Sequence, residues 1–276
     1  MRELNTRLNE QYGRAKLAEE LLSELERAGK DVKALTRQDL VTFEEFHLRG
    51  RNATRELAQL ADLQPGMQVL DVGSGVAGPA RTLADEFGCR VTGIDIAWGY
   101  CRAAQMLNTR TGLNDKIGIC CAQALAAPFA RGVFDVVWLQ HVSMNIDAKE
   151  VLLGELRKLL KPGGRLAIYE ILAGSSPHSY FPLPWANTPD ISFLVEPQQL
   201  RRMLRAKGFS ELHWEDVTQP TLEWGRRALA PRPESPPPLG LEKLIGPDAG
   251  TKTANLLRNL MEDRIRLVQA VVESKP

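Results

Sequence analysis

The segment at residues 69–78, Val-Leu-Asp-Val-Gly-Ser-Gly-Val-Ala-Gly, constrains the fold of this chain more than any other stretch. It predicts a short apolar strand that runs into a glycine-rich turn and then into a helix. Glycines let the backbone turn tightly and let a ligand approach, and the first N–H groups of the helix point at that ligand. A second predicted strand, residues 90–94, ends in Asp95 about 20 residues past Gly75, where an acidic side chain reaches ribose hydroxyls. We therefore expect an adenosine-containing ligand at the carboxyl edge of a parallel sheet.

Asp71, at the end of the first strand, bears on which ligand this is. A fixed carboxylate beside the glycine turn would repel the pyrophosphate of a dinucleotide, whereas the ammonium and sulfonium groups of S-adenosylmethionine favour a nearby carboxylate. Asp71 therefore favours S-adenosylmethionine, and an NAD(P)-linked oxidoreductase is the alternative. Two structural alternatives stay open. The glycines could serve only close helix–sheet packing, and Asp71 could cap the helix that follows.

Composition narrows the class of protein. The chain has 276 residues, enough for one large domain or a domain with a cap. A net charge of +1 with dispersed Lys and Arg disfavours a nucleic-acid partner. We expect no signal peptide and no membrane insertion, because the first residues are charged and polar and no apolar run is long enough. The four cysteines lack metal-ligand spacing, so we expect free thiols in a reducing cytoplasm and no metal site.

Alternating strand and helix patterns predict a parallel α/β sheet. Residues 1–40 and 52–61 are predicted to be helical, as are segments starting near Gly78, Gly99 and Asp147 and the segment 196–207. Lys161–Gly164 is predicted to be a tight turn before a strand, and residues 231–240 a proline-rich connector without packed structure. A β-branched run at the end is predicted to be a strand that pairs antiparallel with residues 211–217. The expected strands are 68–72, 90–94, 116–121, 134–139, 165–171, 211–217 and 265–272.

Four segments follow one another at the separations of a known family: Val69–Gly75, the strand end at Asp95, Phe134–Trp138 and Leu159–Leu166. With them the chain resembles class I S-adenosylmethionine-dependent methyltransferases, and among these the subgroup that holds sarcosine/dimethylglycine and ubiquinone/menaquinone-biosynthesis methyltransferases. Residues 46–50 and 78–81 are also similar to that subgroup.

The resemblance implies a Rossmann-like, doubly wound α/β sheet of seven strands, mostly parallel with an antiparallel last strand. Residues 1–60 would form an N-terminal helical cap or lid, and residues 61–276 the methyltransferase domain. Residues 218–260 would be an insertion between the last two strands. We expect that insertion to lie at the edge away from the glycine turn, where it caps or mediates contacts without binding cofactor.

The resemblance also assigns cofactor contacts. Asp95 would accept hydrogen bonds from both ribose hydroxyls, and Asp71 would contact the methionyl amino group directly or through water. Gln123 stands where the family usually has an aspartate that receives the adenine amino group, and its carbonyl oxygen is still an acceptor. Arg49 could hold the methionyl carboxylate or an acidic substrate, or be a surface residue. The complete expected cofactor set is Asp71, Gly73, Ser74, Gly75, Gly78, Asp95, Ile96, Gln123, Ala124, Leu125, Gln140 and Arg49.

His141, after the fourth strand, is the candidate general base, because an imidazole titrates near neutral pH. Its alternative role is only to shape the pocket, since methyl transfer depends mainly on positioning and desolvation. Asn145 stands where the family often has a histidine and cannot act as a base. The expected substrate residues are His47, Asn145, Phe181 and Trp185, whose aromatic members suit a methylated amine or a quinone-like ring. The predicted function is methyl transfer from S-adenosylmethionine to a small molecule, with a non-catalytic cofactor-binding protein as a further alternative.

Overall fold

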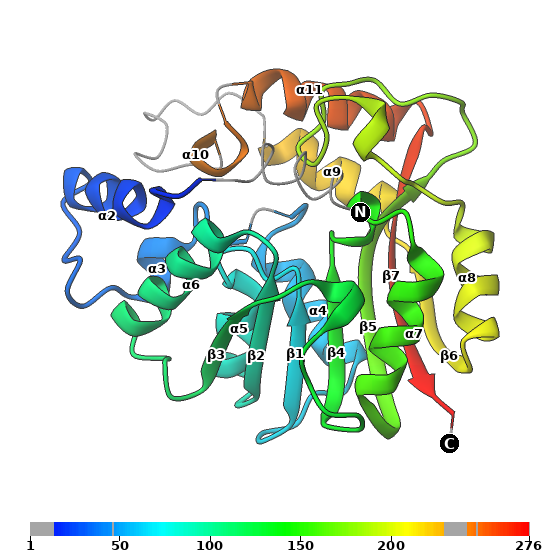
Figure 1. Ribbon diagram of the computed structural model, residues 1–276. Helices are drawn as coiled ribbons and strands as arrows, with labels where there is room; N and C mark the ends of the chain where they lie inside the picture. Colours follow the sequence, from blue (N-terminus) through cyan, green and yellow to red (C-terminus); the bar gives the residue numbers. More distant parts are fainter. Residues whose placement is uncertain (1–13, 46, 229–241, 247, 276) are drawn as a thin grey trace.

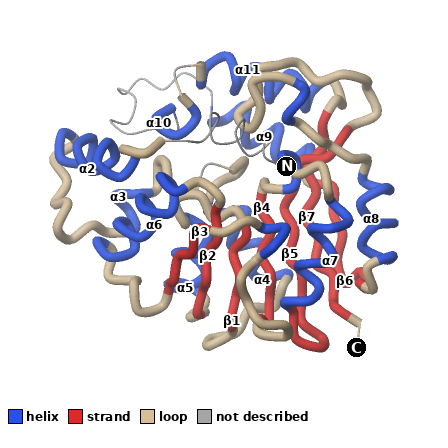
Figure 2. Tube along the Cα trace, in the orientation of Figure 1, coloured by secondary structure: helices blue, strands red, loops and turns tan. Residues whose placement is uncertain are grey.

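The computed structural model describes residues 14–45, 47–228, 242–246 and 248–275. Its centre is a seven-stranded sheet in the order β3-β2-β1-β4-β5-β7-β6 (Figures 1 and 2). Strands β1 to β5 are parallel, and β7 runs antiparallel to both of its neighbours, β5 and β6. The predicted mostly parallel sheet with an antiparallel last strand is therefore confirmed. The strands are β1 Gln68–Val72, β2 Arg90–Asp95, β3 Ile117–Cys121, β4 Phe134–Gln140, β5 Leu160–Ala173, β6 Phe209–Asp216 and β7 Ile265–Ser274.

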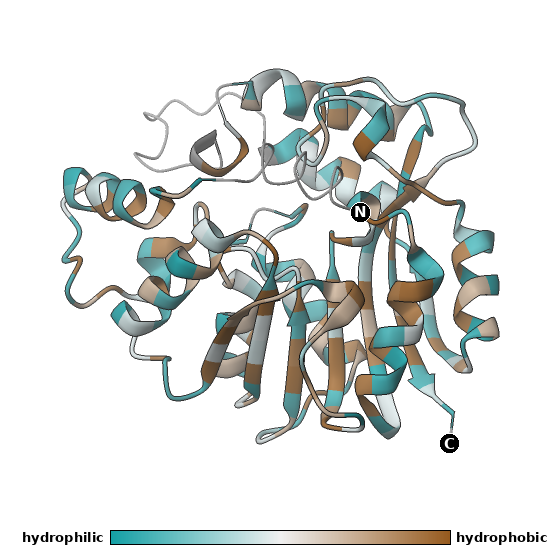
Figure 3. Ribbon diagram, in the orientation of Figure 1, coloured by the Kyte–Doolittle hydropathy of each residue, from teal (hydrophilic) through white to brown (hydrophobic). Residues whose placement is uncertain are grey.

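Helices cover both faces of the sheet, because successive side chains of a strand point to opposite faces. In β1, Val69 packs into the core beneath α4 (Arg51–Leu60) and α5 (Gly78–Glu86). Leu70 and Val72 pack on the other face, beneath α7 (Lys149–Leu159) and α8 (Pro197–Ala206). Figure 3 shows the result, with apolar strands inside and hydrophilic outer helix surfaces.

The N-terminal leucines form a helix as their spacing predicts. Leu17, Leu21 and Leu25 are buried on one face of α2 (Leu17–Arg27), which packs on α6 (Trp98–Arg110). Gly29, at φ +74°, follows the end of this helix, where a left-handed residue favours glycine. A short helix, α3 (Arg37–Leu40), connects α2 to the segment before α4.

The predicted turn at 161–164 is only partly correct. Helix α7 ends at Leu159, and β5 begins at once with Leu160, which pairs with Phe134. The register then shifts, so that Arg165 pairs with Val136. The Pro-Gly-Gly segment is thus a bulge inside a longer strand, with Gly163 at φ +72° to absorb the extra residues.

The insertion between β6 and β7 contains α9 (Thr218–Ala228), α10 (Glu242–Ile245) and α11 (Ala249–Met261). These helices lie over the carboxyl edge of the parallel strands, along the top of Figure 1. Tyr100, on α6 near the glycine turn, donates a hydrogen bond to the carbonyl of Leu244 at 3.3 Å. The expectation that the insertion stays at the far edge of the sheet is therefore wrong. The proline-rich connector at 231–240 lies outside the described residues.

A buried ion cluster around Glu44 ties the segment before α4 to helix α5. Arg81 Nε donates to Glu44 Oε2 at 2.9 Å, and Arg37 donates to Oε1 at 2.8 Å. Arg51 also donates to Oε1, and the Arg81 side chain is fully buried. Three guanidinium groups on one carboxylate keep this buried charge compensated.

Gly78, the first residue of α5, permits the closest approach in this region. A Cβ atom at this position would lie 2.0 Å from the Glu44 carbonyl oxygen and 2.6 Å from Glu45 Cγ. The backbone of the preceding segment can therefore approach α5 only because residue 78 has no side chain.

We find no helix in these described ranges with both the length and the apolar character needed to cross a bilayer.

We expect Gly78→Ala to lower the free energy of unfolding by about 1–3 kcal/mol, since its methyl group must push the Glu44 backbone away. The control is Gly154→Ala in α7, where nothing lies within 4 Å of the added Cβ. That change should be neutral or stabilising by up to about 1 kcal/mol. Urea unfolding followed by circular dichroism measures both, and equal midpoints for the two variants would contradict the packing argument.

Candidate functional site

A cavity of about 990 Å³ opens at the carboxyl ends of β1, β2, β4 and β5. Ligand sites of roughly 300–1,000 Å³ are usual, so this cavity has room for two small molecules side by side. Most of the predicted site residues line it: Gly73, Ser74, Gly75, Asp95, Ile96, Gln123, Ala124, Leu125, Gln140, His141, His47, Asn145 and Trp185. Four predicted residues do not line it: Asp71, Gly78, Arg49 and Phe181.

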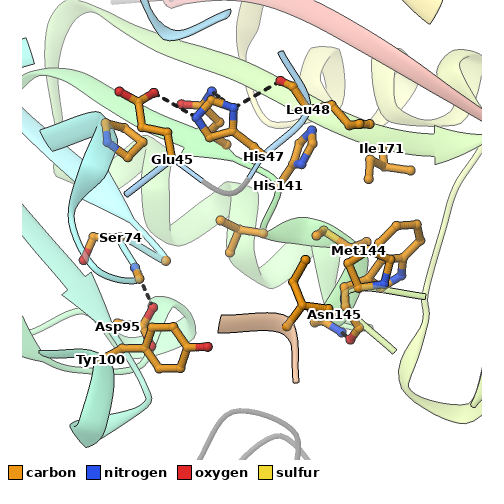
Figure 4. A pocket seen from close by; sticks show the side chains of 18 of the residues that line it. Glu45, His47, Leu48, Ser74, Asp95, Tyr100, His141, Met144, Asn145 and Ile171 are labelled. Carbon is orange, nitrogen blue, oxygen red and sulfur yellow. Dashed lines mark hydrogen bonds and ion pairs between the residues drawn. The ribbon is translucent and has the colours of Figure 1, made fainter. Parts of the chain in front are cut away.

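Asp95, at the end of β2, is fixed at one end of the cavity. Its Oδ2 accepts a hydrogen bond from the Gly75 N–H at 2.9 Å, and its Oδ1 accepts one from the Ala97 N–H at 2.8 Å (Figure 4). Burial raises the pKa of Asp95, and these backbone donors oppose the rise. Each carboxylate oxygen keeps acceptor capacity for a ligand hydroxyl, because an oxygen of this kind accepts more than one hydrogen bond.

The glycine turn beside Asp95 leaves one polar group unused. Ser74 is buried at the cavity wall, and its Oγ has no hydrogen-bond partner among the described residues. Gly73, at φ +67°, packs against Val142, so that a Cβ there would lie 2.6 Å from Val142 Cγ2. Ser74 Oγ lies against Gly93 of β2, where a Cβ would be 2.8 Å from it, so a ligand at this turn would meet mainly the glycine backbone.

Asp71 lies beneath the turn and not in the cavity wall. Because side chains alternate along a strand, the Asp71 side chain lies on the same face of the sheet as Val69, under α5, and is 2% exposed. Its pKa is raised to about 8, first by burial and then by the charges of Asp95 and Glu45, while a backbone hydrogen bond from Ala80 lowers it. Ala80 is in the first turn of α5, so Asp71 bonds to the start of that helix, but its N-cap residue is Ala77 and Asp71 Oδ2 has no hydrogen-bond partner among the described residues. The contact of Asp71 with the cofactor stays a prediction.

Gly78 and Arg49 also have structural partners instead of cavity contacts. Gly78 serves close packing, as described above. The Arg49 guanidinium forms an ion pair with Glu56 of α4. The Arg49 side chain is only 13% exposed, so it forms a part-buried ion pair and is not a solvated surface residue. For Gly78 the packing alternative describes what the structure shows.

His141, directly after β4, lies at the opposite end of the cavity (Figure 4). Its ring stacks on Tyr169 at a centroid distance of 4.8 Å and meets the edge of His47 at 5.8 Å. Burial, together with the charge of His47, holds the pKa of His141 well below its usual range. Within the described part of the chain its buried Nε2 has no hydrogen-bond partner. The imidazole is therefore neutral at pH 7.

His47 belongs to a hydrogen-bonded group behind His141. Its Nε2 lies 3.1 Å from Glu45 Oε2, and its Nδ1 lies 3.1 Å from Gln140 Nε2. Burial would raise the pKa of Glu45, but hydrogen bonds from His47, Thr54 and Thr82 outweigh it and lower this pKa to about 2. Both ring nitrogens of His47 are therefore occupied by protein groups.

Two buried charges that the sequence did not single out hold the loop after β4. Glu170 of β5 accepts hydrogen bonds from the Val142 N–H at 2.9 Å and the Ser143 N–H at 3.1 Å. Burial raises its pKa to about 7. Lys149 donates to the carbonyls of Ser143 and Ile146, and burial lowers its pKa to about 8. Glu170, near the end of the predicted strand 165–171, could have marked this position as a buried charge, but the sequence does not show which loop its side chain faces.

The aromatic and amide candidates differ in position. Asn145 lines the cavity, and its Nδ2 donates to the carbonyls of Trp185 and Ile191, each at 2.9 Å. Trp185 lines the cavity and donates from Nε1 to Ser192 Oγ at 3.0 Å. Phe181 packs against the core and is not among the residues that line the cavity, so its substrate contact stays a prediction.

The insertion supplies the roof of the cavity. Trp224 and Gly225 of α9 line it, as do Ala254, Leu256 and Leu257 of α11. No group of three or more His, Cys, Asp or Glu that could hold a metal occurs among the residues that the structure describes.

Comparison with known proteins agrees with this geometry. Residues 70–168, which span β1 to β5, match the family described as "Methyltransferase domain". Over these residues the chain is similar to methyltransferase domains. The predicted resemblance to S-adenosylmethionine-dependent methyltransferases is thereby confirmed.

Curated relatives and a solved structure extend the match beyond this domain. The chain is 36% identical to the sterol 24-C-methyltransferase of Gibberella zeae over 116 residues, 42% of this chain and 30% of that enzyme. It is 27% identical to the sarcosine/dimethylglycine N-methyltransferase of Halorhodospira halochloris over 169 residues, 61% of each chain. The chain thus spans less than two thirds of the length of these curated relatives. The crystal structure of the cyclase SpnF shares its fold, with a TM-score of 0.66 and 22% identity over 94% of this chain and 93% of that one.

Asp71 yields a testable pH dependence of stability. Its pKa is about 8 in the folded protein and about 4 in an unfolded chain, so between these pH values the folded state holds a proton that unfolding releases. Stability therefore falls as pH rises through this window. We expect Asp71→Asn to remove that loss, so that its advantage over the wild type grows by up to about 1.4 kcal/mol per pH unit. Urea unfolding at pH 5 and pH 8 measures it. The exposed Asp115→Asn control should keep the wild-type pH dependence, and identical pH dependence in all three proteins would contradict the assignment.

Proposed function

We propose that this protein transfers a methyl group from S-adenosylmethionine to a small-molecule acceptor. One observation carries the proposal. A single cavity in the methyltransferase domain joins the Asp95 carboxylate and the glycine turn at one end to the neutral His141 at the other. A nucleoside and an acceptor can therefore occupy the same space side by side.

The groups at the turn fit the proposed cofactor. Asp95 would accept hydrogen bonds from the ribose hydroxyls, since its two oxygens are held in place by backbone donors. Gly73, Ser74 and Gly75 would border the methionyl part. Ile96 and Gln123 line the adjoining wall, together with Ala124 and Leu125, which suits an adenine ring. The bound cofactor supplies the sulfonium methyl group, and its leaving group is neutral.

His141 would take the proton of the acceptor. Methyl transfer moves an electron pair of the acceptor atom to the methyl carbon, and the proton that the acceptor loses must go to a base or to water. The neutral imidazole of His141, at the cavity wall, would be such a base. The stack on Tyr169 fixes the orientation of the ring, while Glu170 and Lys149 hold the loop that follows. The protein would otherwise act by positioning and by excluding water.

We also propose the cytoplasm as the location, because none of the four cysteines is in a disulfide and reducing compartments keep thiols free. The acceptor is the one partner proposed.

Asp95→Asn should weaken binding of S-adenosylhomocysteine about 10- to 100-fold, because hydrogen bonds to a charged acceptor are stronger than those to a neutral amide. Isothermal titration calorimetry with the full chain measures the dissociation constant. Asp115→Asn should bind as the wild type does. No heat of binding from the wild type would overturn the proposed function itself.

His141→Gln should lower the rate of methyl transfer about 100-fold or more, the usual contribution of a general base. Tritiated-methyl S-adenosylmethionine with 2-naphthol, hydroquinone or sarcosine as acceptor gives the rate.

Because the pKa of His141 lies well below 6.5, its neutral form predominates above that pH, and the wild-type rate should not fall between pH 8 and pH 6.5 through this group. An undiminished rate in His141→Gln would leave His141 with a role in pocket shape alone.

A further inference from the structure

The acceptor end of the cavity is apolar, which bears on the substrate class if the proposed function holds. Figure 4 shows Leu48, Met144 and Ile171 in the part of the cavity that holds His141. Trp224 and Leu257 of the insertion line the same cavity, so apolar side chains from the segment before α4, the loop after β4, strand β5 and the insertion contribute to its wall. An acceptor would bury most of its own surface against it.

The charged side chains that line the cavity also bear on the class of substrate. Among the described residues that line it there is no Lys and no Arg. None of these residues would thus offer a cationic side chain to a phosphate or carboxylate. Such a group would lose its hydration without a compensating ion pair.

The carboxylates of the cavity do not serve a cationic acceptor either. Asp95 is at the nucleoside end. Glu44 is paired with three arginines, and Glu45 accepts from His47, Thr54 and Thr82. Asp147 is exposed. An ammonium beside His141 would thus be buried without a free carboxylate, and a protonated amine has no electron pair to receive the methyl group.

We propose that the acceptor is an uncharged molecule with an apolar body and one hydroxyl group, which is methylated on oxygen. The hydroxyl donates its hydrogen bond to the imidazole of His141. As the oxygen–methyl bond forms, the sulfur–methyl bond breaks, its electron pair returns to sulfur, and the hydroxyl proton passes to His141. The products are the methyl ether, S-adenosylhomocysteine and a proton that later leaves to solvent.

The contact between α9 and α11 sets the size of the acceptor end. A Cβ on Gly225 of α9 would lie 2.7 Å from Leu257 Cδ2 of α11, and both residues line the cavity. Leu257 is half-buried, so its side chain is available to the acceptor and tolerates exchange better than a fully buried leucine. Leu257 is therefore the position at which a charge can be introduced to reverse the selectivity.

Binding of three matched probes tests the charge preference without any turnover. The protein saturated with S-adenosylhomocysteine is titrated with 2-naphthol, 2-naphthyl phosphate and 2-naphthylmethylamine, and dissociation constants come from naphthalene fluorescence. We expect 2-naphthol to bind at least about tenfold more tightly than the other two, a difference of about 1.4 kcal/mol. Equal or tighter binding of the phosphate or of the ammonium probe overturns the proposal.

The variant Leu257→Arg provides a second, independent readout. It should weaken 2-naphthol and strengthen 2-naphthyl phosphate, changing the ratio of their dissociation constants by about tenfold or more. Leu257→Met conserves volume and should leave the ratio unchanged. An unchanged ratio in a folded Leu257→Arg protein overturns the placement of the acceptor beside α11. Failure of the proposed function is distinguishable, because it removes S-adenosylhomocysteine binding in the calorimetric titration before any probe is added.

Discussion

The carboxylate of Glu44 is the point on which the walls of the site depend. Arg37, Arg51 and Arg81 converge on it from α3, α4 and α5, and a buried carboxylate is tolerated in the core only with such compensation. The next residues of the same segment are Glu45 and His47, which lie behind the imidazole of His141. Since the segment crosses α5 at Gly78 with no room for a side chain, its position is fixed by packing as well as by charge. Through this ion cluster, the position of α5 thus determines where Glu45 and His47 lie beside the acceptor end of the cavity.

The two ends of the cavity are built on different physical principles. At the nucleoside end, backbone N–H groups and short loops after parallel strands hold polar atoms in place, as is usual at the carboxyl edge of such sheets. At the acceptor end, apolar side chains from distant parts of the sequence meet around one neutral histidine. Polar groups there form hydrogen bonds to other protein groups, as the Asn145 amide and the Trp185 indole do. The fold is shared with the cyclase SpnF, so the activity of this chain must be decided by chemistry at that second end.

Sequence reasoning predicted the elements well, because glycine turns and apolar periodicity are local signals. It identified β1 with its observed bounds, and the β-branched run at the end forms the predicted antiparallel strand β7. Asp95 was placed at the cavity for the same reason, since its distance from the turn is fixed along the chain. For Asp71, alternation fixes that it faces one side of the sheet, but not that α5 covers that side. The partners of Arg49 and Phe181, Glu56 and the core, are matters of tertiary packing that the sequence does not show. Glu170 was missed since its partner loop follows a different strand.

The roof of the cavity has a consequence for how this protein could change. Helices α9 and α11 leave the sheet after β6 and rejoin it at β7, whereas the nucleoside end is built from β1, β2 and the turn between β1 and α5. The two regions thus share almost no chain connections. Exchange of the segment between β6 and β7 for that of a relative would therefore alter the roof of the cavity while keeping β1, β2 and the turn, provided that the carbonyl that accepts from Tyr100 is retained. Such modularity makes the segment a natural target for grafting and for directed evolution.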